Sequence, residues 1–312
     1  MTYTDGAGAQ SGSALWGPRA APAGWGTPYR VTVPDTSEPA EGSGRKPRSL
    51  IVTFYGAYGR ELDGWVSVAD LIRLMGELGV DAPAVRSAVS RLKRRGLLEA
   101  RQVEGTAGYS LSQQAWQVLE EGDRRIYGRR VANVTDGWVL VMFSVPETQR
   151  NKRHLLRSRL TWLGFGTAAP GVWIAPAHLA DEARRTLERL EVSDYVDLFR
   201  ADHLGFGDLA QDIARWWDLD ELQKLYAEFL RVHEPVLERW SRCRAVEPGK
   251  AFADYLRAVE DWRRMPYLDP GLPLELLPEN WSGTRAANVF FELHSRLHDP
   301  GMQHVTDVTS SR

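Results

Sequence analysis

A short basic helix followed by a hairpin, within residues 81–111, is the feature that most restricts how this chain can fold. The helix is predicted by apolar residues at spacings of i, i+3, i+4 and i+7, namely Val85, Ala88, Val89 and Leu92. The Asp81 carboxylate can cap the first-turn N–H groups, and Pro83 lies in that turn, where its missing N–H is not needed. Gly96 is predicted to end the helix.

A hairpin is predicted directly after this helix. Leu97, Leu98 and Val103 indicate one strand, residues 105–108 a turn, and residues 109–111 the returning strand. A polar, basic helix followed by a hairpin is the pattern of a winged helix-turn-helix. In that fold the helix enters the major groove of DNA and the hairpin touches the flanking backbone.

Positive charge is concentrated in the same stretch, although the whole chain carries a net charge of only −2. From Arg86 to Arg101 there is one acid, Glu99, against six basic residues: Arg86, Arg91, Lys93, Arg94, Arg95 and Arg101. The residues predicted to face base edges are Arg86, Ser87, Ser90 and Arg91. Those predicted to meet mainly phosphates are Lys93, Arg94, Arg95 and Arg101. The competing interpretation is a basic helix face that only meets solvent.

The 312 residues suit two or three domains, and composition excludes several classes of protein. A single cysteine, Cys243, excludes an internal disulfide framework and a zinc site with several cysteines. The sequence has neither a long apolar run nor a signal peptide pattern, so we expect a cytoplasmic protein without membrane contact. Residues 1–45, rich in Gly, Ala, Ser, Pro and Thr, are expected to form a disordered arm.

Three units are predicted after this arm, which makes the chain an α+β multidomain protein. The first, 46–130, adds to the basic helix and hairpin further helices over 49–59, 66–75 with Ser67 as cap, and 112–127. The second unit, 136–205, is predicted to contain, in order, a strand over 138–145, a helix over 147–163, two strands around Pro170-Gly171, a helix over 179–192 and a strand over 195–199. That βαββαβ order predicts a ferredoxin-like domain.

The third unit, 206–300, is predicted to be helical and is rich in tryptophan. Its predicted helices are 208–217, 219–244 with a possible kink at Pro235, 250–264, and a last one that ends near Leu297. A proline-rich loop is expected over 265–283, and a disordered tail over 301–312.

Several stretches in this order resemble the PaaX family, bacterial regulators named for the phenylacetic acid degradation repressor. They are RSLIVTFYGAYGR near the start, AVRSAVSRLKRRGLL in the basic helix, WVLVMFSVPETQRNKRHLLRSRLTWLGFG, GVWIAP, WWDL at 216–219 and YLDPGLPLELLPENWSG at 267–283. The resemblance spans roughly residues 48–298. It implies a winged-helix domain, a ferredoxin-like domain similar to a small CRISPR-associated nuclease, and a helical C-terminal domain. It also implies a homodimeric repressor of phenylacetic acid catabolism that an aryl-acyl-CoA such as phenylacetyl-CoA releases from its double-stranded DNA operator.

Such an effector needs cations for its phosphates and an apolar slot for its acyl group. The candidates are Arg263, Arg264, Tyr267, Trp281 and Arg285, provided that the proline-rich loop folds back on the helices. Simple packing of these aromatic residues is the alternative.

Catalytic chemistry finds little support in the sequence, and no catalytic residue, cofactor or metal is predicted. A metal-dependent nuclease would need carboxylates at the end of strand 138–145, but the first acid is Glu147. His294 and His298 have the i, i+4 spacing of a ligand pair, and Cys243 lies between two arginines; solvated side chains explain both patterns more simply. We therefore expect a DNA-binding repressor. The alternative is an enzyme acting on nucleic acid or acyl-CoA that uses its winged helix for protein contact.

Overall fold

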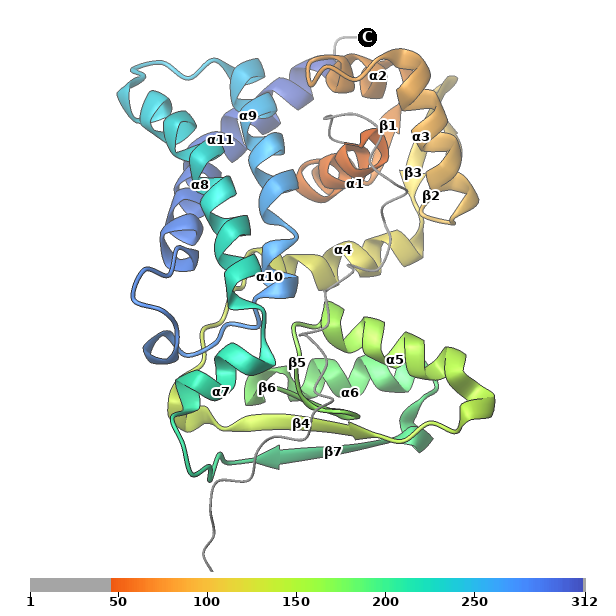
Figure 1. Cartoon of the computed structure of the whole chain (residues 1–312). Coiled ribbons are helices and arrows are strands. Elements are labelled where there is room, and N and C mark those ends of the chain that lie inside the picture. The colour runs from red at the N-terminus through yellow and green to blue at the C-terminus, as the bar shows by residue number, and fades with distance from the viewer. Residues whose placement is uncertain (1–45, 311–312) are drawn as a thin grey trace, which may run out of the picture. The chain divides into compact units, whose positions relative to one another are not determined.

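The computed structural model describes residues 46–310 (Figure 1). The predicted arm over 1–45 lies outside the described residues. The fold is a mixed α+β arrangement with a three-stranded and a four-stranded sheet. None of the described helices combines the length and the apolar character that crossing a membrane requires.

The N-terminal region follows the predicted order of helices and hairpin. Its elements are α1 (Pro47–Ala57), β1 (Trp65–Ser67), α2 (Val68–Gly76), α3 (Ala82–Arg94), β2 (Leu98–Val103), β3 (Thr106–Leu111) and α4 (Gln113–Ile126). The strands pair antiparallel in the order β1-β3-β2. The predicted caps are confirmed, because Ser67 Oγ accepts from the Asp70 N–H at 3.0 Å and Asp81 Oδ1 from the Ala84 N–H at 2.7 Å.

Two local predictions in this region are wrong. Val66 was expected in the second helix but lies in β1, opposite Tyr109 of β3. The hairpin turn is Glu104-Gly105, not residues 105–108, because Val103 already pairs with Thr106. Both turn residues have positive φ, 46° and 79°, as a two-residue turn that matches the strand twist requires.

The middle region forms a four-stranded sheet with two helices. Its elements are β4 (Trp138–Phe143), α5 (Arg150–Trp162), β5 (Gly166–Ala169), β6 (Val172–Pro176), α6 (Ala180–Arg189) and β7 (Val196–Ala201). All strand pairs are antiparallel in the order β5-β6-β4-β7, and α5 and α6 cover one face (Figure 1). Val139 and Val141 point into the core under these helices, whereas Trp138 packs in a separate cluster with Ile213 of α7.

The C-terminal region is helical, as predicted, but its last helix is longer. Its elements are α7 (Leu209–Trp216), α8 (Leu219–Arg242), which continues through Pro235, α9 (Pro248–Trp262), α10 (Met265–Leu268) and α11 (Gly283–Ser310). The expected loop over 265–283 therefore contains the short helix α10. The prediction of a disordered tail from residue 301 is also wrong, because α11 extends to Ser310. The helix continues past Pro300 because an apolar stripe continues with it, at Leu297, Gly301, Val305 and Val308.

The first and last regions share one buried core, which the sequence did not reveal. Phe54 and Tyr58 of the α1 segment pack against Phe252 of α9, with ring centroids 6.5 and 5.6 Å apart. Such aromatic contacts bury large areas and fix ring geometry. Helices α1, α2 and α3 are thus packed onto the C-terminal helices.

Two arginines of the segment after the hairpin fix the regions to one another. Arg125, on α4, donates to the carbonyl oxygens of Leu163 and Pro266 at 3.1 and 3.2 Å and pairs with Glu182 of α6. Arg129 pairs at 3.0 Å with the buried Asp269, whose carboxylate also accepts from the Tyr226 hydroxyl. These basic residues, which sequence inspection could not distinguish from a solvated helix end, therefore have structural roles.

Candidate nucleic-acid interface

Helix α3 presents a basic face whose position is fixed from both ends. Its apolar side is buried against α1 and α2, and Asp81 caps its first turn. At its other end Gly96 has φ 70°, and its carbonyl accepts from the Ser112 hydroxyl at 2.6 Å. Because Ser112 also caps α4 through the Ala115 N–H, one hydroxyl ties the end of α3 to the start of α4.

All residues predicted to face DNA are solvent-exposed: Arg86, Ser87, Ser90, Arg91, Lys93, Arg94, Arg95 and Arg101. Arg91 Nη2 donates to Ser87 Oγ at 3.2 Å along the helix. Within residues 46–310, the remaining five cations, Arg86, Lys93, Arg94, Arg95 and Arg101, form no ion pair. Their charge is therefore not neutralised by the protein's own carboxylates and is available to an anionic partner.

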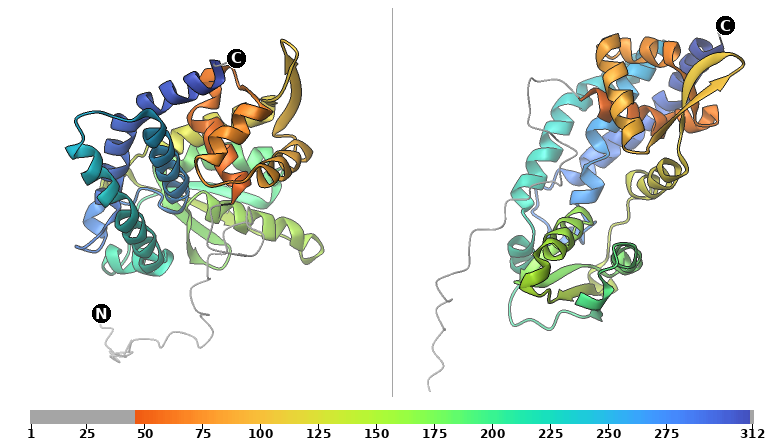
Figure 2. Two further views of the ribbon diagram at one scale, coloured as in Figure 1. Left: turned by 90° about the horizontal axis from the view of Figure 1, so that it is seen from above. Right: turned by 90° about the vertical axis from the view of Figure 1, so that its right-hand side faces the viewer.

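The β2–β3 hairpin directly follows α3 and projects outward from the neighbouring helices (Figure 2). Arg101 lies on β2, and its carbonyl accepts from Trp65 Nε1 at 3.2 Å. The Trp65 ring lies directly over Gly108, where a Cβ atom would come within 2.5 Å of it. Gly108 is therefore a strand residue that makes room for Trp65, and this contact holds the hairpin on β1.

The C-terminal end of α11 contacts the turn between α2 and α3, which the sequence did not predict. His304 Nε2 lies 2.8 Å from a carboxylate oxygen of Glu77, in the turn between α2 and α3. Val305 and Val308 are buried beside this contact. The sequence signal for it is the apolar spacing after Pro300, although a proline inside a helix is unfavourable.

The five residues predicted to bind an effector do not form one site. Arg263 contacts Glu260 and Ser49, whereas Arg285 pairs with Glu234 of α8. Tyr267 stacks on Trp162 with ring centroids 4.3 Å apart. Trp281 packs edge-on against the Tyr226 ring, and Arg264 is exposed.

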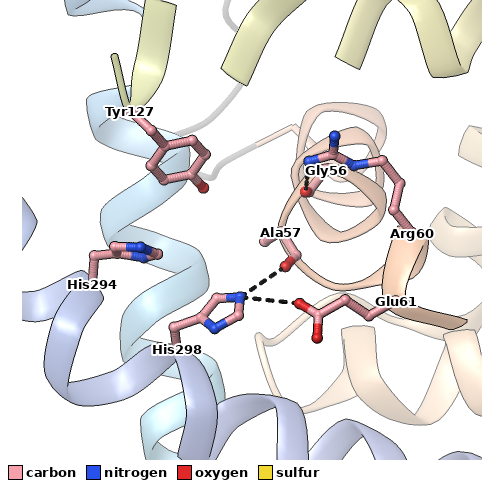
Figure 3. A pocket seen from close by; sticks show the side chains of 7 residues that line it. All are labelled: Gly56, Ala57, Arg60, Glu61, Tyr127, His294 and His298. Atoms are coloured by element: carbon pink, nitrogen blue, oxygen red, sulfur yellow. Dashed lines mark hydrogen bonds and ion pairs between the residues drawn. The ribbon is translucent and has the colours of Figure 1, made fainter. Parts of the chain in front are cut away.

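A cavity of about 210 Å³ lies elsewhere, between α1, the end of α4 and α11 (Figure 3). Its lining consists of Gly56, Ala57, Arg60, Glu61, Tyr127, His294 and His298, and includes none of those five candidates. His298 Nε2 lies 3.3 Å from both the Ala57 carbonyl oxygen and a Glu61 carboxylate oxygen. Burial, and next the charge of His298, lower the pKa of His294, so its imidazole is neutral at pH 7.

The structure does not favour the metal-binding, nuclease or cysteine-based alternatives. Among residues 46–310 there is no cluster of three or more His, Cys, Asp and Glu side chains suited to a metal ion. Glu147, the first acid after β4, pairs with Arg153 at 3.0 Å. Cys243 is exposed at the end of α8.

Comparison with known proteins agrees with the predicted resemblance. Three family models match in order: "PaaX-like protein" over residues 46–115, "PaaX protein central Cas2-like domain" over 132–213, and "PaaX-like protein C-terminal domain" over 217–307. The transcriptional repressor PaaX of Escherichia coli (strain K12) is 26% identical over 263 residues, which cover 83% of each chain.

A solved structure, the uncharacterized protein Rv0674 from Mycobacterium tuberculosis, has the same fold. It superposes with a TM-score of 0.56 at 21% identity, over 85% of this chain and 99% of that one. The three models together account for most of the described residues. The chain therefore belongs to the PaaX family of transcriptional regulators.

Proposed function

We propose that this chain is a transcriptional repressor that recognises a double-stranded DNA operator through a winged helix-turn-helix. The observation that carries the proposal is the exposed face of α3, on which Arg86, Lys93 and Arg94 form no ion pair with the described residues. The repressor named among its relatives supports the same function. Since the family is one of regulators, an enzyme function is not proposed.

The proposed contacts follow from position along α3 and the hairpin. Arg86, Ser87, Ser90 and Arg91 lie toward the start and middle of α3, which is the part of a recognition helix that reaches base edges. Lys93, Arg94 and Arg95 at the end of α3, with Arg101 on β2, contact phosphates. The hairpin is the wing that follows the flanking backbone.

A homodimer would present two α3 helices to successive major grooves, about 34 Å apart, of a partly palindromic operator. We assign dimerisation to the middle region, a ferredoxin-like domain by its βαββαβ order and its strand order. Phe199 lies on the edge strand β7, opposite Leu140 of β4 and close to Met142. Phe199 and Met142 are 49% and 42% exposed, on the face that α5 and α6 leave uncovered.

We also propose that an aryl-acyl-CoA such as phenylacetyl-CoA releases the repressor from its operator, and that the repressor controls phenylacetic acid catabolism. Arg264 and Arg285, both exposed in the C-terminal region, remain candidates for the effector's phosphates, with Arg263, Tyr267 and Trp281 nearer the packed helices. Acting on the chromosome, the repressor would work in the cytoplasm.

The test is fluorescence anisotropy of the purified chain on its own upstream DNA at fixed salt. Tight binding that an unrelated duplex of equal length does not compete supports the operator proposal. Weakening by phenylacetyl-CoA supports the effector, and indifference to it removes that effector alone. Equal binding to both duplexes contradicts sequence-specific recognition on that DNA.

A further inference from the structure

We propose that the solvent side of α5 is a second surface of this chain that contacts the phosphate backbone of DNA. It lies in the middle region, outside the winged helix-turn-helix, and it rests on the proposed function only in taking DNA as the partner. Among the described helices, only α3 and α5 combine several Lys and Arg residues with no acidic residue. The cations of α5 are Arg150, Lys152, Arg153, Arg157 and Arg159.

The charge pattern of α5 differs from that of the other exposed helices. Cations on α8, α9 and α11 pair with an acid one turn away on the same helix, as Arg296 does with Glu292 at 2.6 Å. Helix α5 contains no acid, and its residues Arg150, Arg153 and Arg157 follow one another at spacings of three and four residues. Like charges at these spacings destabilise a helix. An anionic partner would remove this repulsion, so the pattern favours a binding surface over a face that only meets solvent.

The inner side of α5 and two of its cations fix the helix on the four-stranded sheet, one face of which α5 covers together with α6 (Figure 1). Leu156 is fully buried in that core. Arg153 donates to the Val145 carbonyl oxygen at 2.7 Å, and Lys152 Nζ lies 4.6 Å from the centre of the Tyr195 ring. These contacts make α5 a rigid support for the cations that remain.

Two arginines of α5 have no such structural partner. The side chains of Arg150 and Arg159 form neither an ion pair nor a hydrogen bond within residues 46–310. Their separation of nine residues places them on opposite flanks of the helix, about 13.5 Å apart along its axis. A helix with its side chains is about as wide as the major groove, roughly 12 Å, so cations on both flanks can reach phosphates of both strands.

The surface between the two flanks is polar, which favours a nucleic acid over a lipid membrane. It carries Asn151, His154 and Ser158, whose side chains can form hydrogen bonds to phosphate oxygens. A helix that lies on a membrane buries an apolar face in the lipid. The apolar side of α5 is already buried against the sheet, and none of its large hydrophobic residues is exposed. Four of its five cations are arginines, whose planar guanidinium groups match phosphate geometry.

The experiment measures fluorescence anisotropy of the full chain on a duplex of unrelated sequence between 50 and 200 mM salt. The double variant Arg150→Gln/Arg159→Gln removes the two unpaired charges. Each lost phosphate contact reduces the slope of log K against log salt concentration by about 0.9, so we expect a reduction of about 1.8. The loss of affinity should then be about twelvefold larger at 50 mM than at 200 mM salt.

The matched control is Arg184→Gln, which removes an exposed charge from α6, where the exposed acids Asp181 and Glu188 lie one turn away on either side. It should leave the slope unchanged. Thermal melting verifies that each variant is folded. If the double variant is not, Arg150→Gln alone decides the question, with an expected reduction of about 0.9 in the slope.

The outcomes separate this surface from the proposed function. An unchanged slope in the folded double variant, while Arg94→Gln still reduces it, overturns the α5 surface and leaves operator recognition intact. An unchanged slope together with lost binding to vesicles of phosphatidylcholine and phosphatidylserine also overturns it, and identifies a membrane as the partner. Equal binding of the wild type to operator and unrelated duplex contradicts the proposed function, whereas a reduced slope in the double variant still supports the α5 surface.

Discussion

Neutralising Arg94 should weaken DNA binding by an amount that depends on salt in a calculable way. Arg94 is exposed at the end of α3 and forms no ion pair with the described residues, so Arg94→Gln removes one positive charge without breaking an internal contact. Each phosphate contact contributes about 0.9 to the slope of log K against log salt concentration. Losing one contact therefore reduces the slope by about 0.9, and the mutational penalty changes by roughly 3.5-fold between 50 and 200 mM salt.

Anisotropy titrations over that salt range, on the operator and on an unrelated duplex, measure both quantities. We expect Arg94→Gln to weaken binding to the two duplexes by the same factor, because phosphate contacts carry no sequence information. Arg244→Gln, which removes an exposed charge from the connection between α8 and α9, is the control and should leave the slope unchanged. A slope that Arg94→Gln does not alter refutes the assignment of this arginine to the interface.

Four further changes test the fold and the assembly. Asp81→Ala removes the cap of α3 and should lower the free energy of unfolding by about 1 kcal/mol in urea titrations; no loss would mean that the 2.7 Å bond contributes nothing. Val305→Ala should cost about 2 kcal/mol, while the exposed neighbour Thr306→Ala costs little; equal effects would contradict burial of the α11 stripe. Burial, and next the charges of Arg130 and Arg125, lower the pKa of His178 to about 4 in the folded chain. The unfolded chain therefore binds more protons than the folded chain below pH 6.5, and the free energy of unfolding should fall as the pH drops from 6.5 towards 4. His178→Gln should flatten that fall in urea titrations across this range, and an unchanged profile would place its origin elsewhere. Phe199→Lys should shift the chain to monomers in sedimentation velocity, against an unchanged Phe206→Lys control on the loop after β7; a wild-type chain that is monomeric throughout would refute the dimer.

The parts of the fold that depend on neighbouring residues could be predicted from the sequence. Asp81 and Ser67 cap their helices through bonds that span three residues, and the apolar spacing of α3 records its buried side. The hairpin turn was misplaced because Gly105 and Gly108 look alike in a sequence. Only the Trp65 ring over Gly108, a contact across the sheet, shows that the second glycine belongs to a strand.

The candidate functional residues likewise differ in how far the sequence could predict them. The exposed basic residues of α3 were predictable because a basic helix face is a pattern within one element. The cavity was not, since Arg60, Tyr127 and His294 come from three elements that only tertiary packing brings together. The effector candidates could not be placed from the sequence, because residues close in sequence, such as Arg263 and Tyr267, contact different partners, Ser49 and Trp162.

Helix α11 shows that the cost of a proline inside a helix can be outweighed by tertiary packing. A proline inside a helix costs about 3 kcal/mol, which favours ending the helix at residue 299. Continuing it buries Val305 and Val308, and each buried apolar side chain contributes roughly 1.5–3 kcal/mol, so the longer helix is favoured once its partners are in place. The same continuation places His298 and His304 on one helix about 9 Å apart along its axis. One of them lines the cavity and the other contacts the turn before α3, so α11 physically links the C-terminal helices to the segment between α2 and α3. A disordered tail would have left α2 and α3 without that link.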